Sequence, residues 1–248
     1  IMIVLSIITL IISSLMVANV GSGEIDYKNK LFQDQAIIAD HSIVNMVRLD
    51  QIPEPAIINA KNTLRIAYGH TSHGSQIITG MTGLPAFKES KNGTPGLYNW
   101  NDGPLEGYLD IDDYFVSGDL GNPDRITWAN RTREYLNNPS HGDVNVIMWS
   151  WCGQVSSATE EDINLYLNAM TELENEYPNV TFVYMTGHAD GTGESGNLHQ
   201  RNQQIRDYCI KVISKFKCNL GRWVSCVCII LRSSNICCRR SNINMQYP

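Results

Sequence analysis

Three short apolar runs, each followed at once by a polar segment that contains glycine, constrain the fold most. They are residues 63–68, 144–149 and 180–185. Runs of this length without alternating polar residues are typical of strands that are buried on both faces of a sheet. Segments with helical periodicity separate the runs, and strands that alternate with helices form parallel sheets. The sequence therefore predicts an α/β fold, a three-layer α/β/α sandwich with a mostly parallel, flavodoxin-like sheet.

The best-marked helix follows the second run. Ser157 and Glu160 have the spacing of a capping box, and Pro178 ends the apolar periodicity. Further helices are expected from residue 52, from residue 76, over 128–136 and from residue 198. Residues 89–124 are rich in Gly, Asn, Asp and Pro, which predicts long functional loops there.

The chain divides into four parts by composition. Residues 1–22 are almost wholly apolar, carry no charge and end in small residues, which indicates a signal peptide and hence a secreted or extracytoplasmic protein. The alternative is an uncleaved membrane anchor, because the run is just long enough to span a bilayer. Residues 23–50 are expected to be an entry segment, and residues 51–210 the α/β domain.

The last part, residues 211–248, differs sharply from the rest. It holds seven Lys or Arg, no Asp or Glu, and five of the seven cysteines. One interpretation is a small appendage with disulfides, which an oxidising compartment permits. The other is translation in a shifted reading frame after about residue 210, because the composition changes without domain punctuation. In that case the α/β domain lacks its last elements.

The charge of the chain excludes one class of function. The formal net charge is −6, so the chain has no electrostatic footprint for nucleic acid. Neither a Gly-rich phosphate loop nor a recognised metal motif is found, and no cofactor is expected. A membrane would be a partner only through an uncleaved residue 1–22 segment.

Polar groups gather after each of the three predicted strands, at residues 69–76, 150–154 and 186–191. Ligands bind at the carboxyl ends of the strands in sheets of this kind. In the first group, Ser72 is the first candidate nucleophile and Ser75 the second, with His70 and His73 as neighbouring bases. The competing interpretation is a turn in which the two serines cap the next helix.

The other two groups offer a base, a thiol and a substrate platform. His188 is a candidate base or substrate-binding residue. Cys152 is a nucleophile with His70 or His188 as its base, or a buried thiol, or a partner of Cys209 in a disulfide. Of Trp149 and Trp151, one is expected in the core and the other against a sugar. A metal site is an alternative reading of the following set: His70, His73, His188 and Asp190.

The run from Leu64 to Gln76, with its His-Thr-Ser-His-Gly-Ser-Gln block, and the two later strand-end groups resemble the SGNH hydrolase superfamily, also called GDSL esterases. The likeness covers about residues 50–210 and is strongest to a group of secreted bacterial and archaeal proteins with the same block. It implies hydrolysis of small-molecule or carbohydrate esters by Ser72. It also implies an oxyanion hole, for which the candidates are Gly121 with Asn122, or Gly153 with Gln154.

The chain departs from the family pattern in two places. The Gly-Asp-Ser motif is replaced by Gly69-His70-Thr71-Ser72, and no histidine follows His199 to supply the terminal Asp-x-x-His. The base is therefore His188 or another upstream histidine, or else this copy is inactive.

Three functions follow as hypotheses. They are an exported serine esterase, a metal-dependent hydrolase, and a non-catalytic module that binds glycans through Trp151 and the loops of residues 89–124.

Overall fold

The computed structural model describes residues 37–39, 49–216 and 226–229. The predicted signal peptide or anchor, most of the entry segment and most of the basic tail lie outside these residues. The described strands form one parallel sheet of seven strands in the order β1-β7-β6-β5-β2-β4-β3. The predicted α/β fold with a parallel sheet is thereby confirmed.

The connections place helices on both faces of the sheet. From β2 (Arg65–Gly69) the chain moves outward to β4 (Leu109–Asp113), and it then crosses back to β5 (Val146–Trp149), β6 (Thr181–Met185) and β7 (Cys226–Ile229). Right-handed crossovers put helices on opposite faces when the direction of travel reverses. This strand order is that of flavodoxin-like folds.

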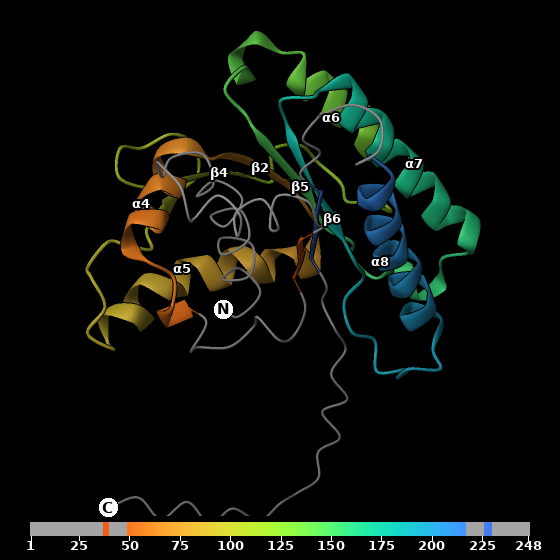
Figure 1. Cartoon of the computed structure of the whole chain (residues 1–248), viewed down its shortest axis with the longest axis horizontal. Coiled ribbons are helices and arrows are strands. Elements are labelled where there is room, and N and C mark those ends of the chain that lie inside the picture. The colour runs from red at the N-terminus through yellow and green to blue at the C-terminus, as the bar shows by residue number, and fades with distance from the viewer. Residues whose placement is uncertain (1–36, 40–48, 217–225, 230–248) are drawn as a thin grey trace, which may run out of the picture.

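The two helical layers have different sizes. Figure 1 shows α4 (Glu54–Thr63) and α5 (Ser75–Glu89) on one side of the sheet, and α6 (Thr127–Leu136), α7 (Glu160–Glu176) and α8 (Asn197–Phe216) on the other. Apolar side chains of both layers pack on strands whose residues are almost all buried. Two short edge strands, β1 (Ile37–Ala39) and β3 (Trp100–Asn101), complete the sheet.

The strand β4 lies inside the segment that the sequence predicts to be loop, so that prediction is wrong at residues 109–113 and at the two residues of β3. Carboxylates at positions 110, 112 and 113 hide the strand pattern. Each of them has a partner distant in the chain: Asp110 lies 3.4 Å from Arg65, Asp112 accepts from the Tyr135 hydroxyl, and Asp113 contacts a histidine. These partners make an acidic strand compatible with a place beside β2.

The capping box of α7 lies two residues later than predicted. Residues 154–157 form a 3-10 turn, and the Ser157 hydroxyl only approaches a carbonyl of that turn. Thr159 is the N-cap instead: its hydroxyl accepts from the Asp162 amide at 3.1 Å, and the Asp162 carboxylate accepts from the Thr159 amide at 2.9 Å. The prediction of a capped helix is correct and the capping residues are not Ser157 and Glu160.

Part of the compositionally distinct tail belongs to the fold. The helix α8 continues to Phe216, and β7 pairs in parallel with β6 on one side and β1 on the other. The tail residues 217–225 and 230–248 lie outside the described residues. None of the helices in the described ranges combines the length and apolar character needed to cross a membrane.

Candidate active site

The polar groups meet where the strand order reverses. The chain leaves β2 toward β4 on one side, while β5 pairs with β2 on the other, so the loops after these strands diverge at the switch point that forms the ligand crevice in folds of this kind. Two of the three non-glycine residues with positive φ among the described residues lie at this edge, Ser72 at 36° and Tyr114 at 57°. Backbone strain of this kind clusters at functional sites.

The Ser72 turn presents one free hydroxyl. Ser72 is exposed, and its side chain forms no hydrogen bond with another described residue. Ser75, the first residue of α5, donates its hydroxyl to the Ser72 carbonyl at 2.5 Å. Between them Gly74 is required, because a Cβ there would lie 2.3 Å from the Cβ of His70. The arrangement leaves Ser72 as the available nucleophile and gives Ser75 a role in the turn.

His70 lies beneath this turn. It is 6% exposed, its ring stacks on Tyr68 with centroids 4.6 Å apart, and Tyr114 packs edge-on against it. Its Nε2 lies 2.8 Å from Asp113 Oδ1, and a carboxylate can only accept, so Nε2 carries the proton. His70 therefore supports the turn from the core side and has no exposed ring atom to offer a substrate.

Two other candidate histidines, His73 and His188, lie together beyond the strand ends. The rings of His73 and His188 stack with centroids 4.0 Å apart. His188 Nδ1 lies 2.9 Å from the Ala189 carbonyl, which fixes the proton on Nδ1 and leaves the lone pair on Nε2. That Nε2 is buried, lies against Gly153 and has no hydrogen-bond partner among the described residues. His188 thus has the tautomer that a general base needs.

The thiol of Cys152 joins this pair. Its Sγ lies 3.5 Å from His73 Nδ1. Cys152 and Cys209 are not joined by a disulfide, so the predicted alternative of a bond between them is wrong. Cys209 is buried in the core on α8, whereas Cys152 is half-buried at the crevice. Sequence reasoning placed Cys152 beside His70 or His188, and the structure places it beside His73.

A buried carboxylate ties the loops together. Asp119 is 1% exposed and accepts from the Thr71 hydroxyl, from the Gly121 amide at 2.8 Å and from the Gln154 side chain at 3.0 Å. Gln154 in turn accepts from the Cys152 amide at 2.9 Å. Asp119 thereby holds together the loops that follow β2, β4 and β5. This role is not predicted from the sequence, because Asp119 lies within the 89–124 segment that is expected to form loops.

These bonds occupy most of the expected oxyanion donors. The Gly121 amide donates to Asp119, and the Gly153 amide donates to Gln154 Oε1 at 3.1 Å. The side-chain amide of Asn122 is exposed and donates to no other described residue. Of the four residues that the resemblance implies, Asn122 is the one whose side-chain donor stays free.

Trp151 and Asp190 do not face the crevice as expected. Trp151 is 3% exposed, with its Nε1 donating to the Met185 carbonyl at 2.9 Å, so both it and Trp149 are core residues and no ring face is open to a sugar. The Asp190 carboxylate accepts from the amide and hydroxyl of Thr192, which lower its pKa. Asp190 is therefore part of a local turn.

The structure shows no cluster of metal ligands that would support the alternative metal site, within the residues that it describes. Across the described ranges, no three His, Cys, Asp or Glu side chains lie together at a spacing that suits a metal ion. His70 is committed to Asp113, and Asp190 to Thr192.

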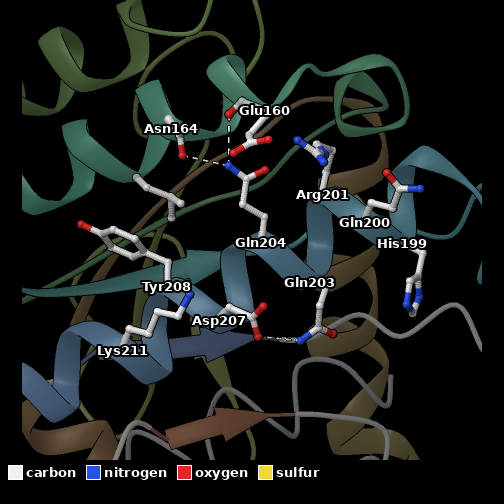
Figure 2. A pocket seen from close by; sticks show the side chains of 11 residues that line it. Glu160, Asn164, His199, Gln200, Arg201, Gln203, Gln204, Asp207, Tyr208 and Lys211 are labelled. Carbon is white, nitrogen blue, oxygen red and sulfur yellow. Dashed lines mark hydrogen bonds between the residues drawn. The ribbon is translucent and has the colours of Figure 1, made fainter.

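A separate pocket of about 550 Å³ lies between α7 and α8, outside the crevice. Figure 2 shows Gln204 reaching across it, where its Nε2 donates to Asn164 and to the Glu160 carbonyl. Acidic and basic side chains alternate around the pocket, so it has no net preference for one charge. The pocket contains His199 and none of the predicted catalytic residues.

Comparison with protein-family models, with curated proteins and with solved structures gives no match for this chain.

Proposed function

We propose that the chain is an exported hydrolase of acyl esters, including those of acylated carbohydrates, with Ser72 as nucleophile and the His73–His188 pair as base. The observation that carries the proposal is this stacked pair beside the exposed Ser72 turn, in which His188 keeps a free Nε2 lone pair. A serine hydroxyl needs such an acceptor to attack a carbonyl. The resemblance to SGNH hydrolases points to the same serine.

The proposed reaction has two halves. Ser72 Oγ attacks the acyl carbon while His188 Nε2 accepts the hydroxyl proton, and the free side-chain amide of Asn122 donates to the oxyanion. The ester bond breaks, and the departing alkoxide takes the proton back from His188. Water then attacks the acyl-serine with the same base, which releases the acid and restores Ser72.

The first test is hydrolysis of p-nitrophenyl acetate by the full chain. We expect Ser72→Ala to lower kcat/KM by about a thousandfold or more, and His188→Ala by about a hundredfold. Ser140→Ala and His199→Ala are matched controls at exposed or separate positions and are expected to keep the parent rate. A parent rate in Ser72→Ala would overturn the proposal.

A fluorophosphonate probe gives an independent readout. We expect the label on the peptide that contains Ser72, and loss of the label in His188→Ala because the hydroxyl is no longer activated. Labelling of Ser75 instead would contradict the assignment of the nucleophile, because the Ser75 hydroxyl is bonded to the Ser72 carbonyl.

One observation favours a second candidate, a cysteine hydrolase. The contact between Cys152 Sγ and His73 Nδ1 is the kind of pair that produces a thiolate nucleophile. In that case iodoacetamide abolishes activity by alkylating Cys152, and Cys152→Ala is inactive whereas Ser72→Ala keeps most of its rate. If Ser72 is the nucleophile, Cys152→Ala retains turnover and the fluorophosphonate label.

A further inference from the structure

The guanidinium of Arg125 is a cation at the edge of the crevice that the sequence did not single out. It lies in the loop between β4 and α6, with its Cζ 5.8 Å from the centroid of the Trp151 ring. Its side chain is only 19% exposed. A cation over an aromatic face is stabilised by the ring electrons, so this contact fixes the position of the guanidinium.

Arg125 lies beside Gln154, in the turn that follows β5, over a glycine. A Cβ built on Gly121 would lie 2.5 Å from Arg125 Nη1 and 2.5 Å from Gln154 Cγ, so these two side chains meet over the bare face of Gly121. Gln154 Oε1 accepts from the amides of Cys152 and Gly153. The guanidinium is therefore one side chain away from the turn whose thiol contacts His73.

Arg125 forms an ion pair with Asp162, and that pair is long. Asp162 Oδ1 lies 3.6 Å from Arg125 Nε, which is longer than a charge-assisted hydrogen bond. The other oxygen of Asp162 accepts from the Thr159 amide, the main cause of its lowered pKa, to which the charge and side chain of Arg125 also contribute. In the part of the chain that the structure describes, the two Nη groups of Arg125 donate no hydrogen bond.

The other nearby carboxylates are committed elsewhere. Asp119 is bonded to Thr71, Gly121 and Gln154. Asp124 accepts from the amides of residues 126 and 127, which lower its pKa. A part-buried guanidinium with free, coplanar donors matches the geometry of a carboxylate, which can accept two parallel hydrogen bonds.

We propose that Arg125 binds a carboxylate of the substrate, so that the site selects esters whose acyl or alcohol part carries a negative charge. For its catalytic consequence this rests on the proposed hydrolysis at Ser72. The guanidinium anchors the charged end, Trp151 and Gly121 fix its position, and the ester carbonyl is left to the Ser72 turn.

The catalytic test compares mono-p-nitrophenyl succinate with p-nitrophenyl butyrate, which have the same chain length and differ in charge. We expect the parent chain to prefer the anionic ester by about tenfold in kcat/KM, and Arg125→Gln to lose that preference. Arg125→Lys should restore part of it. Arg131→Gln is the matched control, because it removes a nearby positive charge that donates to the Ser117 carbonyl. Loss of the preference in both variants would indicate long-range attraction and overturn the assignment.

The binding test does not depend on turnover. Succinate and the neutral succinamide are titrated calorimetrically into the parent chain, Arg125→Gln and Arg131→Gln. We expect succinate alone to bind, at least tenfold more weakly in Arg125→Gln and unchanged in Arg131→Gln. If neither ester is cleaved but succinate binds through Arg125, the hydrolase proposal fails and the carboxylate site stands. If succinate binds no better than succinamide, or equally well without Arg125, the carboxylate site is refuted whatever the esters show.

Discussion

Asp119 connects three loops at the carboxyl edge through a single buried side chain. Its carboxylate accepts from the Thr71 hydroxyl, the Gly121 amide and the Gln154 side chain. Of these three donors, only Gly121 lies near Asp119 in the sequence. The Ser72 turn, the loop that contains Gly121 and the turn that contains Gln154 therefore share one support. Removal of that support should disturb stability and the site together.

We expect Asp119→Ala to lower the free energy of unfolding by about 3 kcal/mol, because three donors lose a buried acceptor. Asp119→Asn keeps one carbonyl oxygen and should cost about 1 kcal/mol. Urea unfolding followed by fluorescence measures both. Equal stability of the Ala variant and the parent would show that water replaces the carboxylate and that the three loops are independent.

Glu174 predicts a pH dependence of stability. It lies on α7, accepts from the Tyr184 hydroxyl at 3.2 Å, and burial raises its pKa to about 7. A carboxyl whose pKa is raised by folding contributes its full stabilisation below the unfolded pKa of 4.5, and that stabilisation is lost as pH rises from there to the folded pKa of about 7. We expect this group to lower the free energy of unfolding by about 3 kcal/mol between pH 4.5 and about pH 7.5, and Glu174→Gln to remove most of that fall. An unchanged slope in the Gln variant would exclude Glu174 as its cause.

At the scale of elements, the capping box of α7 is correctly predicted but assigned to the wrong residues. Both Ser157–Glu160 and Thr159–Asp162 have capping-box spacing, and the sequence alone does not rank them. Ser157 is the last residue of the 3-10 turn over residues 154–157, and the helix begins at Glu160 with Thr159 as its N-cap. The choice depends on how the loop leaves β5, which is a tertiary property.

Thr159→Ala should therefore destabilise the protein by about 1 kcal/mol, through loss of the bond between its hydroxyl and the Asp162 amide. The matched variant Ser157→Ala should change stability by less than about 0.5 kcal/mol, because that hydroxyl is exposed and its bond is long. Thermal unfolding of both variants gives the comparison. The reverse order of effects would show that the helix begins at Ser157 in solution.

Prediction from sequence succeeded where burial leaves a continuous apolar signal. β5 and β6 were placed to within two residues at each end. It failed at β4, whose acids are matched by Arg65, Tyr135 and His70, partners that no local pattern reveals. In the site, His70 and His73 look alike in the sequence, and only the tertiary structure separates the buried ring from the exposed one.

For the whole molecule, the sheet itself depends on a segment of the basic tail. β7 lies between β6 and β1, with Val227 opposite Val183 on one side and Ile37 on the other. The amides of a strand that lies between two others are hydrogen-bonded to its neighbours, so the amides of residues 226–229 should exchange slowly with deuterium. Val227→Pro removes one donor and should lower stability by about 3 kcal/mol. Rapid exchange there, with no effect of proline, would place this segment outside the sheet and favour the frame-shift interpretation of the tail.

The stacked rings of His73 and His188 can be separated without unfolding of the sheet. The two rings belong to loops that leave different strands and meet only through their faces. One cut by a protease in the loop of residues 186–196 would let the rings drift apart while every strand kept its neighbours. Under the proposed function, a nicked population would keep its circular dichroism and yet lose ester hydrolysis. Denaturing electrophoresis, which reports whether the backbone is intact, would then be a better guide to activity than a spectrum of the folded state.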